Sequence, residues 1–456
     1  MLLKQFFIDK IAHSSYLIGG NQTCAIVDPS RDIDWYLEAA EEEGLRITHI
    51  IETHLHADFV SGHLDLADAT GAEIYAPKAG NCTFKHVAVE QGDEFIIEDM
   101  KFHVLETPGH TPDCLVYAVS DLSRGEEPVL AFTGDTLFVN DVGRPDLFPG
   151  RAKELAEKLY HNLHDKVMKL PDSCFVLPAH GAGSLCGKAM GSMRFSTIGY
   201  EKQHNPALLI KDINEFVKSL TEDMPPAPDH FARCSDINRK GPVLVKTLSS
   251  PKPMSPKDFR EKSQEGNTII VSLRDYATFG GQHIPGSYHI DVSGNFSTFA
   301  GWILPPDKDI LLVTNDPKKA DKATVMLRRV GLDRAFGYLR GGTHAWVMSG
   351  YETEHIYQLS PAEVHEKITK EGYTLLDVRS KDEFDAGHVK GAINILGMDL
   401  RTEYTKLESE KPVIAMCGSG HRSSIACSIL KQKGFKYVYN AAGGITGYRN
   451  AGFLKS

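Results

Sequence analysis

The stretch IIETHLHADFVSGH, residues 50–63, places three side chains that can bind metal directly after an apolar run. The run predicts a buried strand, and His54, His56 and Asp58 follow it at every second position. Imidazole and carboxylate groups gathered in this way are typical of a transition-metal site. A hydrolase with two metal ions would be expected to carry another histidine next, but that position is Phe59. The stretch therefore predicts a metal site that differs from that of a two-metal hydrolase.

Three more candidate ligands stand at the ends of predicted strands further along the chain. His110 ends LETPGH, Asp135 ends LAFTGD and His180 ends FVLPAH. A lone histidine is more often structural, whereas an ordered set of this kind is a much more specific sign of metal binding. Together with THLHAD, these segments resemble the metallo-β-lactamase fold over residues 1–210. The resemblance implies an αββα sandwich with metal bound at one edge of the two sheets.

The two-metal hydrolases of this superfamily, glyoxalase II among them, use the motif HxHxDH. With Phe59 in place of the last histidine, the second metal site keeps only Asp58, His180 and the shared Asp135. A phenyl ring cannot ligate a metal ion, so the sequence argues against a second tightly held ion. It argues equally against the bridging hydroxide with which such hydrolases attack their substrates.

The remaining ligands suit a single metal ion. Two imidazoles and one carboxylate with open positions form the facial triad of non-haem Fe(II) oxygenases. The chain resembles the persulfide dioxygenases of the ETHE1 type, which implies one Fe(II) per chain held by His54, His110 and Asp135. The other candidates are then expected to orient these ligands or to hydrogen-bond waters: His56, Asp58 and His180.

Residues after Asp135 suggest how substrate is handled. The segment NDVGRPDLFPG resembles a GR-x-D loop of the ETHE1-like group, in which Arg144 either reaches the acidic part of a thiol substrate or braces the site. Cys186 is either a second thiol that handles sulfur or a packing residue. Tyr200, Lys202 and His204 are candidates for the substrate entrance.

The second half of the chain contains a repeat. MSPKDFREK begins at 254 and LSPAEVHEK at 359, and HIPGSYHI begins at 283 and HVKGAINI at 388, so both pairs are 105 residues apart (359 − 254 and 388 − 283). Each SP start has serine as a helix N-cap, proline at the first helical position and an acidic residue three positions after the serine. Two homologous α/β modules are predicted, after a proline-rich connection. The expected boundaries are 1–220 for the metal-binding domain, 221–251 for the connecting segment, 252–356 for the first module and 357–456 for the second.

The second module contains a glycine-rich loop between the apolar strand VIAM and a helix pattern that begins near Ser423. Its six residues are Cys417, Gly418, Ser419, Gly420, His421 and Arg422. Glycines allow successive backbone N–H groups to point inward and form an anion nest at the start of a helix. Such an environment is expected to lower the pKa of the Cys417 thiol.

This module resembles a rhodanese, a sulfurtransferase whose cysteine carries a persulfide. LLDVRSKDEFDAGHVKGAINI, residues 375–395, matches a signature of that family, and the six-residue loop has the sulfurtransferase length. The resemblance implies that Cys417 carries sulfane sulfur, while Arg422 and the loop amides hold the anionic acceptor. Four residues of the signature are expected to stabilise the fold: Asp377, Arg379, Glu383 and His388.

The first module departs from the rhodanese pattern. In DILLVTNDP, Thr314 or Asn315 stands where Cys417 would be, and no glycine loop follows. Without a thiol no persulfide can form. Residues 252–356 are therefore expected to be a catalytically degenerate rhodanese-like domain that serves as a spacer or docking surface.

Composition and charge narrow the class of protein. Of 456 residues, 41% are hydrophobic and 24% charged, as in ordinary globular proteins. No apolar run is long enough to span a membrane. A net charge of −10 without a long Lys/Arg block argues against nucleic acid or anionic membrane as partner. Eight scattered cysteines and no recognisable secretion signal predict reduced thiols in a cytoplasmic protein.

The order of the three domains resembles that of bacterial persulfide dioxygenase–sulfurtransferase fusions. The resemblance implies oxidation of a thiol persulfide by O2 to thiol and sulfite, after which Cys417 transfers sulfane sulfur to sulfite and forms thiosulfate. The expected partners are thus persulfide, O2, sulfite and thiosulfate, in a homo-oligomer that is a dimer or a tetramer. The reverse order, in which thiosulfate supplies the dioxygenase, stays open.

Two other functions remain as alternatives. One is a zinc-dependent thioester hydrolase like glyoxalase II, with a rhodanese appendage. The other is a sulfur carrier or redox sensor built on Cys417. Glutathione, coenzyme A, bacillithiol and cysteine are all open as the thiol carrier.

Overall fold

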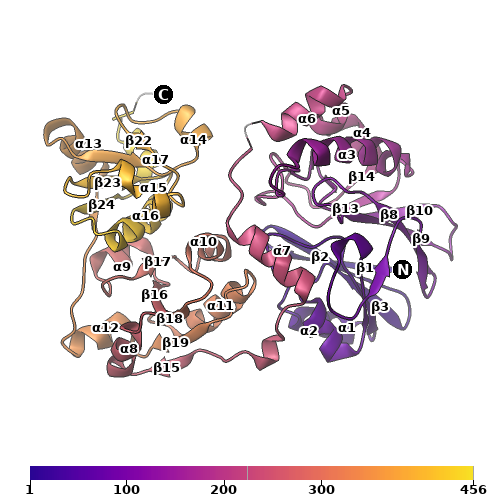
Figure 1. Cartoon of the computed structure of the whole chain (residues 1–456), viewed down its shortest axis with the longest axis horizontal. Coiled ribbons are helices and arrows are strands. Elements are labelled where there is room, and N and C mark those ends of the chain that lie inside the picture. The colour runs from indigo at the N-terminus through magenta and orange to yellow at the C-terminus, as the bar shows by residue number, and fades with distance from the viewer. Residues whose placement is uncertain (223, 455–456) are drawn as a thin grey trace. The chain divides into compact units, whose positions relative to one another are not determined.

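The computed structural model describes residues 1–222 and 224–454. The chain forms two compact units. The first comprises Met1–Leu248 with Arg328–Gly331, and the second comprises Ser249–Leu327 with the residues from Leu332 onward (Figure 1). Across the described residues, no helix combines the length and the apolar character that crossing a bilayer requires.

The first unit begins with a six-stranded sheet in the order β1-β2-β3-β4-β5-β6. Its first three strands are antiparallel neighbours, and β3 to β6 run parallel. The parallel strands need crossovers, which α1 and α2 supply after β3 and β4. The elements are β1 (Leu2–Ile8), β2 (His13–Gly19), β3 (Thr23–Val27), α1 (Asp34–Glu42), β4 (Arg46–Ile51), α2 (His63–Thr70), β5 (Glu73–Pro77), the 3-10 helix η1 (Lys78–Gly80) and β6 (Val87–Val89).

A second six-stranded sheet follows in the order β14-β13-β10-β9-β8-β7, with a small hairpin of β11 and β12 beside it. Its strands and helices are β7 (Glu94–Ile97), β8 (Met100–Glu106), β9 (Leu115–Asp121), β10 (Pro128–Gly134), β11 (Leu137–Phe138), β12 (Asp141–Val142), α3 (Ala152–Asp165), η2 (Val167–Lys169), β13 (Phe175–Pro178), β14 (Ser196–Thr197), α4 (Ile198–His204), α5 (Pro206–Leu209) and α6 (Ile213–Thr221). Strands β8, β10 and β13 point the same way, so their carboxyl ends lie on one edge of this sheet.

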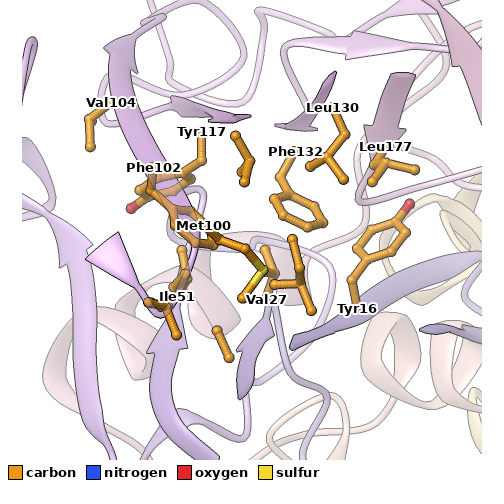
Figure 2. Packing of buried hydrophobic residues seen from close by; sticks show 14 of the residues in the cluster. Tyr16, Val27, Ile51, Met100, Phe102, Val104, Tyr117, Leu130, Phe132 and Leu177 are labelled. Carbon is orange, nitrogen blue, oxygen red and sulfur yellow. The ribbon is translucent and has the colours of Figure 1, made fainter. Parts of the chain in front are cut away.

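Alternating apolar side chains pack the two sheets face to face. On β2, Tyr16 belongs to the core between the sheets, whereas Leu17 packs on the other face with α1. Phe102 of β8 and Phe132 of β10 meet this inner core from the second sheet (Figure 2). Helices α3 and α6 cover the outer face of the second sheet, where Leu159 is buried. These layers confirm the expected αββα sandwich.

The segment expected to be a connection, residues 221–251, contains the helix α7 (His230–Lys240) and a 3-10 turn, η3 (Val245–Thr247). The side chains of His230, Phe231, Cys234 and Asn238 on α7 are buried. The prolines flank this helix instead of interrupting it, which is why their clustering suggested a linker. The helix packs as part of the first unit, which extends to Leu248.

The second unit holds two parallel five-stranded sheets of the same design, β15-β19-β18-β16-β17 and β20-β24-β23-β21-β22. The first repeat comprises β15 (Lys252–Met254), α8 (Pro256–Ser263), β16 (Thr268–Ser272), α9 (Tyr276–Gly281), β17 (Tyr288–His289), α10 (Phe296–Ile303), β18 (Asp309–Val313), α11 (Pro317–Arg328), β19 (Ala335–Leu339) and α12 (Gly342–Met348). The second comprises β20 (Tyr357–Leu359), α13 (Pro361–Lys370), β21 (Thr374–Asp377), α14 (Lys381–Asp385), β22 (Ile393–Asn394), α15 (Leu400–Glu403), η4 (Tyr404–Lys406), β23 (Val413–Met416), α16 (His421–Gln432), β24 (Val438–Ala441) and α17 (Gly444–Asn450).

The serine caps predicted from the repeat are present. The Ser255 side chain accepts from the Asp258 backbone N–H at the start of α8, and Ser360 does the same with Glu363 at the start of α13. At Ser360 the glutamate side chain also returns to the cap backbone and completes a capping box. The two modules therefore begin in the same way because the same local sequence begins each helix.

The inner core of the sandwich can be tested at Phe102, which is fully buried. Phe102→Ala should destabilise the first unit by about 3–5 kcal/mol, because it leaves a cavity between the sheets. Hydrogen exchange of the β8 to β10 amides in the full chain would measure the loss. Ile96→Ala, on the neighbouring β7 at a side chain that is 58% exposed, is the control and should cost far less. Equal losses for the two variants would contradict the packing described.

Candidate metal centre and thiol loop

Three candidate ligand side chains meet where the carboxyl ends of β4, β8 and β10 approach each other. His54 follows β4, His110 lies in the turn after β8, and Asp135 follows β10 directly. The Asp135 Oδ2 atom is 3.7 Å from His54 Nε2 and 3.3 Å from His110 Nε2. All three side chains are buried, and within the described part of the chain these three atoms have no hydrogen-bond partner. Buried polar atoms left unpaired around one point fit a bound metal ion, which would be their missing partner.

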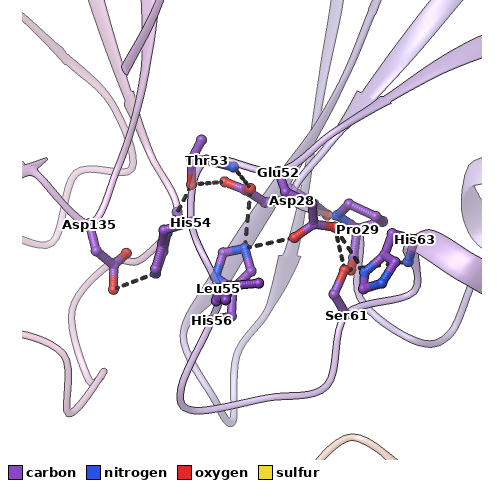
Figure 3. A network of polar contacts seen from close by, with 12 residues as sticks. Asp28, Pro29, Glu52, Thr53, His54, Leu55, His56, Ser61, His63 and Asp135 are labelled. Atoms are coloured by element: carbon purple, nitrogen blue, oxygen red, sulfur yellow. Dashed lines mark hydrogen bonds and ion pairs between the residues drawn. The ribbon is translucent and has the colours of Figure 1, made fainter. Parts of the chain in front are cut away.

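The far side of each imidazole is held by the protein. His54 Nδ1 is 3.0 Å from Thr53 Oγ1, whose proton goes to Asp28 Oδ2 at 2.9 Å, so the hydroxyl accepts from the imidazole (Figure 3). His110 Nδ1 donates to the Arg144 carbonyl oxygen at 2.8 Å. Both rings therefore carry their proton on Nδ1 and direct the Nε2 lone pair to the centre. Burial lowers the pKa of His54 well below its ordinary value and lowers that of His110 as well.

His180 lies between two carboxylates. Its Nδ1 atom is 2.8 Å from Asp135 Oδ1 and its Nε2 atom is 2.9 Å from Asp58 Oδ2. Burial would lower the pKa of His180, but the two carboxylates outweigh burial and hold the pKa well above its ordinary value. A protonated imidazole has no lone pair for a metal ion. In this arrangement His180 holds the Asp135 carboxylate through Nδ1, as expected of a residue that supports the candidate ligands.

Cys186 completes a second group of ligand-type atoms with Asp58 and His180, all within 4.8 Å of one another. Burial raises the pKa of the Cys186 thiol well above its ordinary value, with further increases from the neighbouring carboxylates. Its side chain packs with Phe138 and Phe231. These surroundings favour the packing role for Cys186, because the reactive form of a thiol is the thiolate.

His56 is turned away from the three ligands. Its Nε2 atom is 3.1 Å from Asp28 Oδ1 and 3.6 Å from Glu52 Oε2 (Figure 3). Burial lowers the pKa of His56, but these carboxylates outweigh burial and raise the pKa to about 9. Phe59 is fully buried and packs against the rings of His56 and His13, with centroids 4.5 and 4.1 Å apart. Phe59 thus fills apolar space beside the centre.

Arg144 acts as a brace in this geometry. Its guanidinium donates to both carboxylate oxygens of Asp146 at 2.6 and 2.7 Å, and to the carbonyl oxygens of Leu185 at 3.1 Å and Pro225 at 2.6 Å. The side chain is buried, so it has no free face for a substrate. Because the Arg144 carbonyl oxygen holds His110, these contacts fix the position of a candidate ligand. Of the two roles considered for this residue, the geometry favours bracing.

The proposed entrance residues lie on α4. The Tyr200 ring packs on His204 with centroids 4.7 Å apart, and Lys202 pairs with Asp172 at 2.5 Å. Among the described residues, neither of these contacts includes His54, His110 or Asp135.

Sequence patterns did not single out Asp28, which follows β3 and accepts a hydrogen bond from the Thr53 hydroxyl. An acidic residue directly after the apolar strand TCAIV was the available signal.

The loop of Cys417 closes around its sulfur. Cys417 directly follows β23, and α16 begins at His421, two residues before the expected start. Cys417 Sγ accepts from the Gly420 backbone N–H at 3.1 Å and from Ser423 Oγ at 3.4 Å. Gly420 has φ +102°, a conformation that L side chains rarely adopt, which explains glycine at this position.

Arg422 is held beside this loop by Glu383. The guanidinium makes two hydrogen bonds to the carboxylate, at 2.6 and 2.7 Å, and this contact lowers the pKa of Glu383 to about 2. Arg379 forms a buried pair with Asp377, and His388 stacks on Phe384 with centroids 3.7 Å apart. Glu383, Asp377, Arg379 and His388 therefore support the loop and its module from outside.

Strand register decides which residue of the first repeat matches Cys417. Asp377 pairs with Met416 in the second repeat, and Ser272, which lies 105 positions before Asp377, pairs with Val313 in the first. Met416 precedes Cys417 and Val313 precedes Thr314, so Thr314 occupies the cysteine position. Tyr276, the first residue of α9 in the first repeat, packs its ring on His421 of the second repeat, with centroids 4.9 Å apart. The first repeat thus lacks the thiol but contacts the loop that carries it.

The family models that match this chain cover the same segments as the separate groups of sheets. The family model described as the metallo-beta-lactamase superfamily matches residues 8–180. The model described as the rhodanese-like domain matches twice, over residues 255–349 and 360–451.

Individual relatives agree with this division. Persulfide dioxygenase ETHE1, mitochondrial, from Bos taurus is 30% identical over 240 residues, which cover 51% of this chain and 85% of that protein. Hydroxyacylglutathione hydrolase from Pseudomonas entomophila is 33% identical over 160 residues, but these cover only 35% of this chain and 58% of that protein. A crystal structure of a metallo-beta-lactamase from Staphylococcus aureus subsp. aureus COL is 35% identical with a TM-score of 0.67, covering 74% of this chain and 98% of that chain.

Metal retention at mildly acidic pH tests whether His54 and His110 bind a metal ion. Protons compete with metal for imidazole only below its pKa, and the pKa values of His54 and His110 lie below the ordinary 6.5. The metal content after dialysis at about pH 6 should therefore equal that at neutral pH. Half-loss of metal at or above pH 6.5 would contradict these assignments. His103→Ala, at a histidine whose side chain is 40% exposed, is the control and should leave the metal content unchanged.

Proposed function

The chain belongs to the metallo-β-lactamase superfamily as a homologue of the ETHE1 persulfide dioxygenases and carries two tandem rhodanese-like domains, and we propose that it oxidises a thiol persulfide to sulfite. The balanced reaction is R–S–S⁻ + O2 + H2O → R–SH + SO3²⁻ + H⁺. The observation that carries the proposal is the set of three unpaired, buried ligand atoms on His54, His110 and Asp135.

The residues favour one Fe(II) ion in that position. Two neutral imidazoles and one carboxylate are the donor set of non-haem iron oxygenases with open coordination positions. When bound, the iron would supply the activation of O2 and a site for the persulfide sulfur. A second ion is disfavoured because both ring nitrogens of His180 face carboxylate oxygens, which hold its pKa well above the ordinary value, and because Phe59 offers no ligand.

The surrounding residues keep this donor set in place. Thr53 and the Arg144 carbonyl set the orientation of the two imidazoles. His180 holds Asp135 Oδ1, so that Asp135 Oδ2 is the oxygen left for the metal ion. Burial of these groups also keeps bulk water away from the sulfur that is to be oxidised. The protein thus contributes orientation and a dry site.

Cys417 is proposed to use the product of the first site. A second persulfide would transfer sulfane sulfur to the thiolate, Cys417–S⁻ + R–S–S⁻ → Cys417–S–S⁻ + R–S⁻. Sulfite would then take that sulfur, Cys417–S–S⁻ + SO3²⁻ → Cys417–S⁻ + S2O3²⁻. The Gly420 amide, already bonded to the Cys417 sulfur, and Arg422 would stabilise the anions. One chain that carries both sites raises the effective concentration of sulfite for the second step.

Two variants should separate the proposed function of the metal centre from that of Cys417. His110→Ala should lower persulfide-dependent O2 uptake by more than about a hundredfold, because loss of a ligand should cost more than loss of its supporting contacts. Cys417→Ser should preserve O2 uptake and make sulfite accumulate in place of thiosulfate. Oxygen-electrode traces with sulfite and thiosulfate assays measure both effects.

The matched control is Cys427→Ser, which changes a buried cysteine on α16 outside the loop and should leave the product ratio unchanged. An unchanged thiosulfate yield in Cys417→Ser would refute the coupling of the two sites. Zinc in the purified protein, together with thioester hydrolysis and no persulfide-dependent O2 uptake, would refute the dioxygenase and favour a hydrolase of the glyoxalase II class.

A further inference from the structure

A buried asparagine on the neighbouring strand holds the carbonyl side of the Cys417 loop. Asn440 lies on β24 and is fully buried, and its side-chain N–H group donates to the Gly420 carbonyl oxygen at 3.1 Å. The Gly420 backbone N–H donates to Cys417 Sγ. Gly420 is therefore fixed on both sides, by the cysteine sulfur through its N–H group and by Asn440 through its carbonyl oxygen.

The contact with Asn440 matters because a glycine backbone is free to adopt many conformations. Gly420 has φ +102°, and no side chain restricts rotation of the peptide groups on either side of it. The Ser424 backbone N–H also donates to the Gly420 carbonyl oxygen, at 3.2 Å, at the start of α16. Asn440 adds a contact from outside the helix, and it thereby opposes the rotation that would turn the Gly420 N–H away from the sulfur.

Gln358 on β20 holds Asn440 in turn. The Asn440 side-chain N–H group donates to Gln358 Oε1 at 2.7 Å, and Gln358 Nε2 donates to the Ile356 carbonyl oxygen at 2.9 Å. An asparagine amide nitrogen has two hydrogens, and the contacts with Gly420 and Gln358 use both of them. The orientation of the Asn440 side chain therefore depends on the position of Gln358.

The first repeat lacks this pair of amides. Pro253 stands 105 positions before Gln358 (358 − 253), which is the offset of the repeat, and it pairs with Tyr338 as Gln358 pairs with Asn440. Two modules of the same design therefore differ at the amide pair and at the cysteine position together. This joint difference indicates that the pair serves the loop of Cys417 instead of the fold that both modules share.

Helix α9 of the first repeat contacts both the loop and the amides behind it. The helix lies against β20 and α16 of the second repeat (Figure 1). The Ile356 backbone N–H donates to the Gly280 carbonyl oxygen at 2.9 Å, and Gln358 Nε2 occupies the place where a Cβ at Gly280 would lie. At the first residue of α9, Tyr276 Cζ is 3.4 Å from the place where a Cβ at Gly420 would lie.

We propose that Asn440 is a positioning residue for the Cys417 sulfur, acting through Gly420, and that α9 of the first repeat keeps it in place through Gln358. The inference rests on the proposed sulfur transfer and gives the first repeat a part in that reaction. When sulfite takes the sulfane sulfur, the Cys417 sulfur leaves as a thiolate, and a hydrogen bond from the Gly420 N–H stabilises its negative charge. A loop with that N–H turned away would lose this stabilisation, while Arg422 would still bind sulfite.

A single anaerobic turnover tests Asn440 separately from the metal centre. The full chain is loaded with sulfane sulfur from glutathione persulfide, freed of excess persulfide and mixed with sulfite. Asn440→Leu should lower the maximal rate of thiosulfate release roughly tenfold, the effect expected for one lost hydrogen bond. The sulfite concentration that gives half of the maximal rate should stay unchanged, a separation that general loss of stability would not produce. Tyr338→Leu, at the matching position of the first repeat, is the control and should change neither quantity.

Adjacent glycines test the contribution of α9. Gly280→Ala places a methyl group against Gln358 and should lower the same maximal rate. Gly281→Ala is the matched control, because among the described residues no atom lies within 4 Å of the new methyl group. If Asn440→Leu fails to fold, Gln358→Met is the substitute, since it removes an acceptor of Asn440 at a partly exposed side chain and should lower the rate in the same direction.

Hydrogen exchange of the Gly420 amide gives the second measurement. Exchange should be faster in Asn440→Leu and in Gly280→Ala, while the amides beyond the first turn of α16 keep their protection. Unchanged thiosulfate release and unchanged Gly420 exchange in Asn440→Leu would overturn the inference and leave the proposed sulfur transfer standing. Equal effects of Gly280→Ala and Gly281→Ala would overturn the part assigned to α9. If the wild-type chain releases no thiosulfate, the proposed transfer fails, and Gly420 exchange by itself then supports or overturns the positioning by Asn440.

Discussion

The buried contact of His180 with two carboxylates, those of Asp58 and Asp135, is the constraint on which the rest of the metal centre depends. It leaves Asp135 with one oxygen for the proposed ligand set and places both ring nitrogens of His180 against carboxylate oxygens. Phe59 adds a second obstacle, because it fills space beside His56 with an apolar ring. One carboxylate oxygen and two imidazoles therefore face a common point, which is why one metal ion is the better proposal.

The supporting contacts come from both sheets, so the centre depends on the whole sandwich. Asp28 at the end of β3 holds Thr53 after β4, while the Arg144 carbonyl holds His110 after β8. His110 and Asp135 are each oriented by a group from another part of the chain, and Thr53, which orients His54, is itself held by Asp28. Helix α7 extends the same arrangement, because Asn238 ties it to the carbonyl oxygens of His56 and Phe59. Helix α7 and the ligand stretch are thus parts of one packed structure.

Patterns local in sequence were sufficient for much of the fold and of the candidate site. The serine–proline starts at Ser255 and Ser360 predicted the caps of α8 and α13, since a cap depends on four consecutive residues. The offset of 105 residues predicted two equal modules. The sequence left Thr314 and Asn315 as equal candidates for the cysteine position, because only the pairing of β16 with β18 sets the register. It also treated α7 as a linker, because prolines flank it on both sides.

The sequence by itself determined the order of the ligand segments, the repeat and the single loop thiol, because each is a pattern of residue types along the chain. Only the tertiary structure decided which way each side chain points. His56 stands two residues from His54, yet its Nε2 atom faces Asp28. The Arg144 guanidinium binds Asp146 and two carbonyl oxygens. Such choices depend on which groups folding buries together, because a buried charge must find a partner among the groups that surround it.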